Sequence, residues 1–257
     1  MKKAVKSFDA INFSVGVEKT KISIIDIQQI DSSLKLYMDE YFVRICEGDS
    51  ASSIKQVKNR LLRFLEKKDM NTRMGATAEF FVHLYLGTLQ FKQDCLFLNL
   101  EENSIKKGFD GNYTKNGESW LMESKSGAHS SSQSGHCLKI GVAYTDLVNK
   151  LAGKASNNPW QNAYNHASHI DVRTKKDIRD QLKKLSDDYS NGIFYKTIDF
   201  NIIPCATVFM DGIWKMYDKK ALAKRIFEIV KKFKYKDIRV ICITKKSVDL
   251  FVNYLRI

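Results

Sequence analysis

Apolar and polar residues recur along the first part of the chain in patterns that predict both strands and helices. The segment KISIIDIQQI (21–30) is rich in β-branched residues and predicts a strand. Residues 53–67 carry apolar side chains at helical spacing with basic residues between them, which predicts an amphipathic helix. A second helix is predicted over 74–90, and DCLFLNLE (94–101) predicts a short strand.

The second half of the chain alternates between helices and strands. A helix is predicted over 139–151, and two helical segments are predicted within 159–189, separated near 169–171. The remaining elements are, in order, a strand at 201–210, a turn at Asp211-Gly212, a short strand at Trp214–Tyr217, a helix at 219–233, a strand at 237–244 and a helix at 247–255. Strands separated by helices predict an α/β fold, with a central mixed β-sheet flanked by helices.

Between these halves, the segment KKGFDGNYTKNGESWLMESKSG (106–127) predicts a β-hairpin. Its Asn116-Gly117 pair is the strongest short-range signal for a two-residue turn, because both turn positions favour positive φ. The small and polar segment that follows, 127–136, predicts a loop. Counted outward from the turn, Lys115 faces Glu118, Tyr113 faces Trp120 and Asp110 faces Glu123.

This register places two carboxylates across from each other. Directly opposed residues of an antiparallel pair have Cβ atoms about 4.5–5.5 Å apart. Asp110 and Glu123 would therefore repel each other, and a divalent cation between them would remove that repulsion.

The same strand also brings a lysine beside the second carboxylate. Glu123 and Lys125 share one face with Leu121, because strand side chains alternate, while Met122 and Ser124 point to the other face. Phosphodiester hydrolysis uses this combination, since oxygen ligands hold Mg²⁺ and the cation activates water and stabilises developing charge. A neighbouring lysine can orient the water, or help to deprotonate it if the lysine pKa is lowered. The plain alternative is an exposed hairpin in which Lys125 only neutralises Glu123.

Asp110, a gap of twelve residues and then Glu123-Ser124-Lys125 resemble the core motif of the PD-(D/E)xK nuclease superfamily. The resemblance implies a restriction-endonuclease-like core. It implies that Asp110 and Glu123 bind Mg²⁺ or Mn²⁺, that the main-chain carbonyl of Ser124 adds a ligand, and that Lys125 serves the attacking water.

The superfamily also places an acidic residue on a helix before the hairpin. Glu79, in GATAEFFVHLYL, occupies that position, which implies an auxiliary metal ligand or a water-binding group. A solvent-facing helix carboxylate is the alternative for Glu79. The sequence departs from the motif in having Phe109, not proline, before the aspartate, and that position is lenient. The resemblance rests on residues 74–126.

The overall layout is also similar to the nuclease subunit of Hachiman-type antiphage defence systems. The similar features are GFDG, a strand ending in ESK, a helical stretch, and a β-α-β-α part over 200–257 that begins with IPCATVFMDG. In that family the nuclease works with a separate helicase. The resemblance implies a role in antiphage defence, with an ATP-dependent helicase partner that restrains the nuclease until activation.

The excess of basic residues indicates which class of molecule the protein binds. Forty-two Lys and Arg against twenty-nine Asp and Glu give a net charge of +13 and a pI of about 9.4, which favours a polyanion such as DNA. A solvated lysine surface would give the same composition. The five scattered cysteines include no C-x-x-C pair, so a zinc ribbon is not indicated. The sequence contains no Walker loop, so any ATP-driven step is expected to be carried out by a partner protein.

The length of 257 residues predicts a single domain, 1–257. We expect this domain to lie in the cytoplasm. No apolar run reaches the length of a membrane span, and the N-terminus lacks the apolar core of a signal peptide. Two minor candidate sites arise from the helical region. Gln161 could support the active site from the next helix, although a polar residue at a helix start is the simpler interpretation. His166 and His169 could face the same way on a helix, but they lack a third zinc ligand nearby.

Two other functions are compatible with the sequence. The protein could be a non-catalytic, nucleic-acid-binding regulatory subunit that retains the acidic hairpin only structurally. It could also be a stand-alone sequence-specific restriction endonuclease, a homodimer that cuts without ATP.

Overall fold

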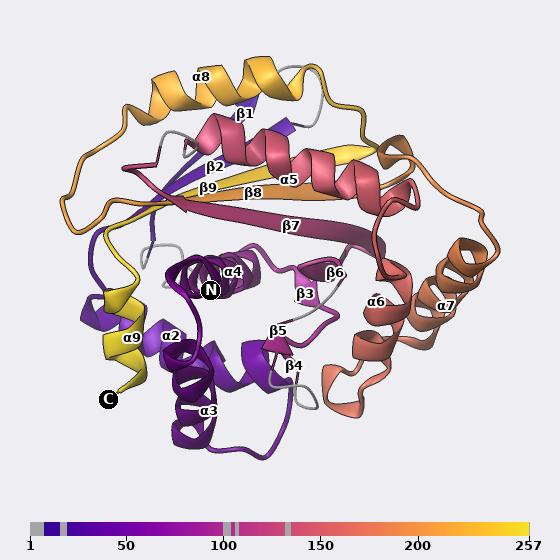
Figure 1. Ribbon diagram of the computed structural model, residues 1–257, viewed down its shortest axis with the longest axis horizontal. Helices are drawn as coiled ribbons and strands as arrows, with labels where there is room; N and C mark the ends of the chain where they lie inside the picture. The colour runs from indigo at the N-terminus through magenta and orange to yellow at the C-terminus, as the bar shows by residue number, and fades with distance from the viewer. Residues whose placement is uncertain (1–7, 16–19, 100–103, 106–107, 132–134, 257) are drawn as a thin grey trace.

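The β-branched segments of the chain assemble into one sheet at the centre of the protein (Figure 1). The structure is a computed structural model that describes residues 8–15, 20–99, 104–105, 108–131 and 135–256. In spatial order, the sheet of the described residues contains β1 (Asp9–Val15), β2 (Thr20–Ile27), β9 (Asp237–Lys245), β8 (Asn201–Phe209), β7 (Glu118–Ala128), β6 (Gly111–Lys115) and β3 (Lys92–Gln93). Two further short strands, β4 (Leu98–Asn99) and β5 (Ser104–Ile105), pair separately.

The sheet is mixed, as the sequence predicts. Strands β7, β8, β9 and β2 run parallel to one another. The pairs β1–β2, β6–β7 and β3–β6 are antiparallel. The predicted α/β fold, with a central mixed sheet flanked by helices, is therefore confirmed.

Helices cover both faces of this sheet and fill two hydrophobic cores (Figure 1). One face carries α2 (Ser32–Glu47), α3 (Ile54–Glu66), α4 (Met70–Thr88) and α9 (Asp249–Leu255). The other carries α5 (His136–Leu151) and α8 (Lys219–Val230), with α6 (Pro159–Ser168) and α7 (Lys176–Ser190) beside them. Strand β7 separates the cores, because Trp120 and Met122 enter the first and Leu121 enters the second. The predicted alternation along this strand is confirmed.

Local sequence signals explain where the predicted helices begin. Ser53 forms a capping box with Gln56 at the start of α3, and Val57, Leu61 and Leu65 then bury one face at four-residue spacing. Helix α4 begins a turn earlier than predicted, because the side chain of Asp69 caps the backbone N–H of Thr72.

Two predicted strands differ from the structure. Within the predicted strand 94–101, only Leu98–Asn99 (β4) is a strand among the described residues, and residues 100–101 lie outside them. The predicted strand Trp214–Tyr217 is wrong, because this segment crosses from the end of β8 to α8 and pairs with no strand in the described part of the chain. Within the described ranges, no helix combines the length and the apolar character needed to cross a membrane.

Candidate active site

The hairpin of β6 and β7 has the predicted turn and register. Asn116 and Gly117 both have positive φ, +52° and +81°, as a type I′ turn requires. Lys115 pairs with Glu118 and Tyr113 pairs with Trp120, as predicted. Strand pairing ends at Gly111 opposite Met122, so Asp110 lies one residue beyond the ladder, level with Glu123.

Asp110 is fixed by the backbone of the opposite strand. Its Oδ2 accepts a hydrogen bond of 2.8 Å from the N–H of Ser124. The glycine after Asp110 is needed for this approach, because a Cβ on Gly111 would lie 2.6 Å from Cε2 of Tyr113 and 3.0 Å from Cε of Met122. The Gly-Phe-Asp-Gly pattern therefore has a steric reason at its last position.

Glu123 lies at the centre of a cluster of charged side chains and is only 1% exposed. Its Oε1 is 3.0 Å from Nζ of Lys125, and its Oε2 is 2.5 Å from Nζ of Lys150. Lys125 also contacts Oδ2 of Asp146 at 2.6 Å. The cluster thus joins the middle of β7 to helix α5, which packs against β7 and β8.

The pKa of Glu123 is set by opposing effects of its burial and of the charges around it. Burial and the nearby Asp110 carboxylate raise the pKa of Glu123 above its usual range, against the opposing effects of Lys150 and Lys125. An ammonium group on each oxygen is nevertheless the arrangement of an ionised carboxylate. Glu123 therefore depends on the positive charges of Lys125 and Lys150 to stay ionised in its buried position.

The pKa of Lys125 is shifted in the direction opposite to that expected of a lysine acting as a general base. Burial alone would lower its pKa, but the carboxylates of Glu123, Asp110 and Asp146 together raise the pKa above the usual lysine value. The side chain therefore stays protonated at neutral pH. The suggested role of Lys125 as a base with a lowered pKa does not fit this geometry, whereas a role as a fixed positive charge does.

Sequence reasoning missed the two residues that α5 contributes. Asp146 and Lys150 are four residues apart on the predicted helix 139–151, so they share one face of that helix. Their spacing is visible in the sequence. Which face of the helix would meet β7 is not visible, because it depends on how α5 packs against β7 and β8.

Glu79 lies on α4, on the opposite face of the sheet from α5. Burial is the main cause that raises the pKa of Tyr113, and the carboxylates of Glu79 and Asp110 both add to it. Glu79 and Asp110 thus both act electrostatically on Tyr113, whereas the ion pairs of Glu123 come from β7 and α5. The structure thus brings together Asp110, Glu123, Ser124 and Lys125, and it places Glu79 on α4, on the other face of the sheet from α5.

The donor atoms at this place fit a divalent cation of the magnesium type. Asp110, Glu123 and the Ser124 carbonyl are hard oxygen donors, and the repulsion between the two carboxylates is what a cation relieves. In a strand, the N–H and C=O of one residue point the same way, so the Ser124 carbonyl also points toward Asp110. Among the residues that the structure describes, no three acidic, histidine or cysteine side chains form a ready-made metal cage.

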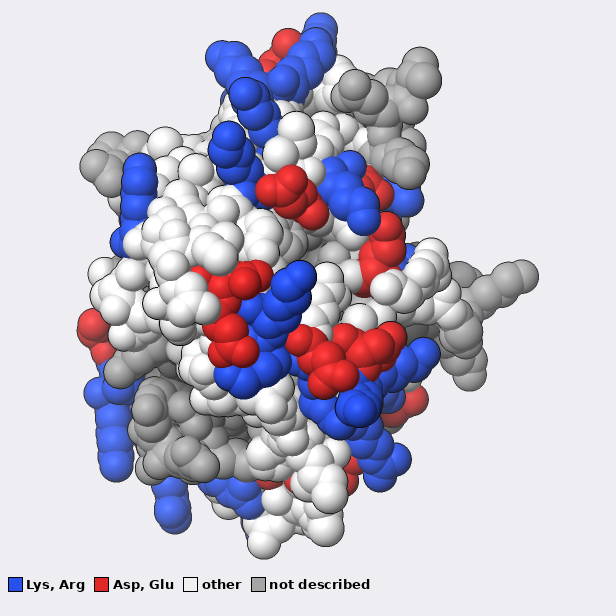
Figure 2. Space-filling view, turned by 90° about the vertical axis from the view of Figure 1, so that its right-hand side faces the viewer, with Lys and Arg blue, Asp and Glu red and all other residues white. Residues whose placement is uncertain are grey.

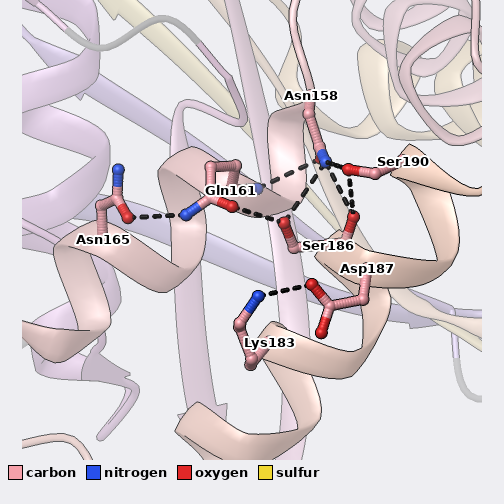
Figure 3. A network of polar contacts seen from close by, with 7 residues as sticks. All are labelled: Asn158, Gln161, Asn165, Lys183, Ser186, Asp187 and Ser190. Atoms are coloured by element: carbon pink, nitrogen blue, oxygen red, sulfur yellow. Dashed lines mark hydrogen bonds and ion pairs between the residues drawn. The ribbon is translucent and has the colours of Figure 1, made fainter.

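Gln161 has a structural role in the network between α6 and α7 (Figure 3). Its Oε1 accepts a hydrogen bond from Ser186 of α7, and its Nε2 donates to Asn165 of α6. Asn158, which caps α6, donates to the same Ser186. This agrees with the simpler interpretation of Gln161 as a helix-start polar residue.

The two neighbouring histidines bond to backbone N–H groups. Nδ1 of His166 accepts from Leu96, and Nδ1 of His169 accepts from Asp171.

The charged surface is mixed on the face that carries α6 and α7. Figure 2 shows Lys and Arg interleaved with Asp and Glu on this side, not gathered in a single basic stripe. An example is the exposed ion pair of Lys183 and Asp187 on α7. The excess of positive charge is therefore partly balanced locally on this face.

Comparison with known proteins adds no family assignment. No protein-family model matches the chain, and no curated protein sequence matches it significantly.

Proposed function

We propose that this protein is a Mg²⁺- or Mn²⁺-dependent nuclease of the PD-(D/E)xK type that cleaves phosphodiester bonds of DNA. The observation that supports this most is the buried Glu123, held beside Asp110 and between two lysine ammonium groups. The lysine side chains remain 28% and 19% exposed, so the cluster is open to solvent on the lysine side.

The roles of the residues follow from their charges. Asp110, Glu123 and the Ser124 carbonyl would hold the cation, which when bound supplies Lewis-acid activation of the phosphate and of the attacking water. Lys125, kept protonated by its carboxylate neighbours, would donate hydrogen bonds to the phosphate and offset its developing negative charge. Glu79 is a candidate for an auxiliary, water-mediated contact from α4.

A role in cytoplasmic antiphage defence with an ATP-dependent helicase partner is part of the same proposal. It is supported by the resemblance of the layout to Hachiman nuclease subunits and by the lack of a Walker loop in the sequence. The net charge of +13 favours DNA as the substrate.

One observation favours a different function. Both oxygens of Glu123 already contact lysine ammonium groups, so the cluster is an ion-pair network that could stabilise a non-catalytic regulatory subunit. That subunit would bind nucleic acid through its basic surface and would not cut it.

Metal dependence separates these two functions. We expect the protein to cut plasmid or single-stranded DNA with Mg²⁺ or Mn²⁺, and to stop on addition of EDTA. The assay should be run alone and with the helicase partner, with RNA of the same sequence as a second substrate. Binding of DNA without cutting under every one of these conditions would support the regulatory subunit instead.

A further inference from the structure

The ammonium group of Lys150 is in contact with oxygen atoms of the kind that also bind metal cations. Its Nζ is 2.5 Å from Oε2 of Glu123 and 2.5 Å from the main-chain oxygen of Gly108. Gly108 comes two residues before Asp110, so the two oxygens belong to the two arms of the hairpin. Carboxylate and carbonyl oxygens are also the ligands that Mg²⁺ and Mn²⁺ prefer.

Lys150 and a divalent cation compete for the same oxygen of Glu123. A Mg²⁺ ion lies about 2.0–2.1 Å from its oxygen ligands, so an ammonium group in contact with that oxygen blocks the approach on its side. The other oxygen of Glu123 faces Lys125, which Asp146 also holds. Of the two lysines, Lys150 is the one without a second carboxylate contact among the ion pairs of the described residues.

Addition of a divalent cation changes the sign of the net charge of the cluster. Asp110, Glu123 and Asp146 contribute three negative charges, and Lys125 and Lys150 contribute two positive ones, which leaves −1. Addition of a divalent cation gives +1, which matches the single negative charge of one phosphodiester group. The displaced ammonium group is then free to contact that phosphate.

Resting on the nuclease function above, we propose that Lys150 exchanges between two partners. In the metal-free site it is the counter-cation of Glu123, and in the metal-loaded site it contacts the scissile phosphate. Metal binding thereby delivers a second positive charge to the substrate, in addition to Lys125.

Metal binding without nucleic acid tests the first half of this proposal. Replacing Lys150 by methionine keeps the length of the side chain and removes the competing charge, so Lys150→Met should bind Mn²⁺ about tenfold or more tightly than wild type. Free Mn²⁺ can be followed by electron paramagnetic resonance. Lys150→Arg, which retains the competing charge, should bind like wild type, and so should Lys154→Met, the same charge change at an exposed position just after α5.

Nucleic-acid binding tests the second half. With Ca²⁺ in place of Mg²⁺, the affinity of Lys150→Met for a short DNA oligonucleotide, measured by fluorescence anisotropy, should fall by about fivefold more than that of Lys154→Met. Equal affinities of these two variants would overturn the phosphate contact.

The possible failures are distinct. If wild type and Lys150→Met bind Mn²⁺ equally and Glu123→Gln abolishes binding in both, the exchange of Lys150 is overturned while the nuclease site stands. If none of these proteins binds Mn²⁺, the proposed function fails along with the exchange.

Discussion

Replacement of Lys125 by methionine is expected to lower the rate of DNA cleavage by about 10²- to 10³-fold, the usual cost of removing one group that stabilises transition-state charge. The ammonium group of Lys125 is held between Glu123 and Asp146, at 3.0 and 2.6 Å, and is kept protonated by them. Methionine retains the shape of the side chain but no charge. Single-turnover cleavage rates at saturating Mg²⁺ measure this loss.

The matched control for this variant is again Lys154→Met. It makes the same change in net charge at an exposed lysine, so it should cut at nearly the wild-type rate. Circular dichroism and thermal unfolding establish that both variants are folded. A Lys125→Met protein that cuts as fast as Lys154→Met would remove Lys125 from the active site.

The second large effect concerns stability and lies on the α4 side of the sheet. Lys245 ends β9 and is fully buried, with its Nζ 4.3 Å from the centre of the Phe81 ring. No described residue offers that Nζ a hydrogen bond, and burial lowers the pKa of Lys245 from 10.5 to about 7. The buried position therefore costs stability at every pH at which the lysine of the unfolded chain is protonated.

Lys245→Met is accordingly expected to stabilise the protein by up to about 4 kcal/mol at pH 7, since one unit of pKa shift corresponds to about 1.4 kcal/mol. The thioether fits the apolar surroundings of Phe81 and needs no partner. Denaturant unfolding measures the difference in free energy between variant and wild type.

The pH dependence of this difference follows from the direction of the shift. Between pH 7 and 10.5 the unfolded chain keeps a proton on Lys245 that the folded protein has lost, so the free energy of unfolding of wild type rises with pH in this window. Below pH 7 the lysine is charged in both states and the cost is full. The advantage of Lys245→Met should therefore be largest below pH 7 and shrink toward pH 10.

Lys246 provides the control at the next position of the chain. It is only partly buried, so Lys246→Met should change stability little and without this pH profile. An advantage of Lys245→Met that is absent, or that grows with pH, would show that the buried lysine is not a source of instability.

Much of the fold was predictable from local patterns. The Asn116-Gly117 turn fixes the hairpin, and its register puts Glu123 and Lys125 on the face of Leu121. The strands at 201–210 and 237–244 were predictable because they are nearly continuous apolar runs, as buried parallel strands are.

Other features of the fold and the site were not predicted, and most of them depend on tertiary packing. The apolar spacing of α2, with Leu34, Met38, Phe42 and Ile45 all buried, is a helical signal in the sequence, although α2 is not among the predicted elements. The choice of Asp146 and Lys150 as partners of β7 depends on how α5 lies on the sheet, which local sequence does not encode. The burial of Lys245 is hidden for the same reason, because a lysine at a strand end usually reaches solvent.

The central claim is that Glu123 is an active-site carboxylate and not a structural ion-pair residue. Cleavage of DNA by Glu123→Gln tests it most directly, compared with Glu118→Gln, a change of the same chemistry at an exposed position of the same strand. If the claim is correct, Glu118→Gln cuts like wild type in Mg²⁺, while Glu123→Gln is folded and inactive. A folded Glu123→Gln protein that cuts as well as Glu118→Gln would contradict it.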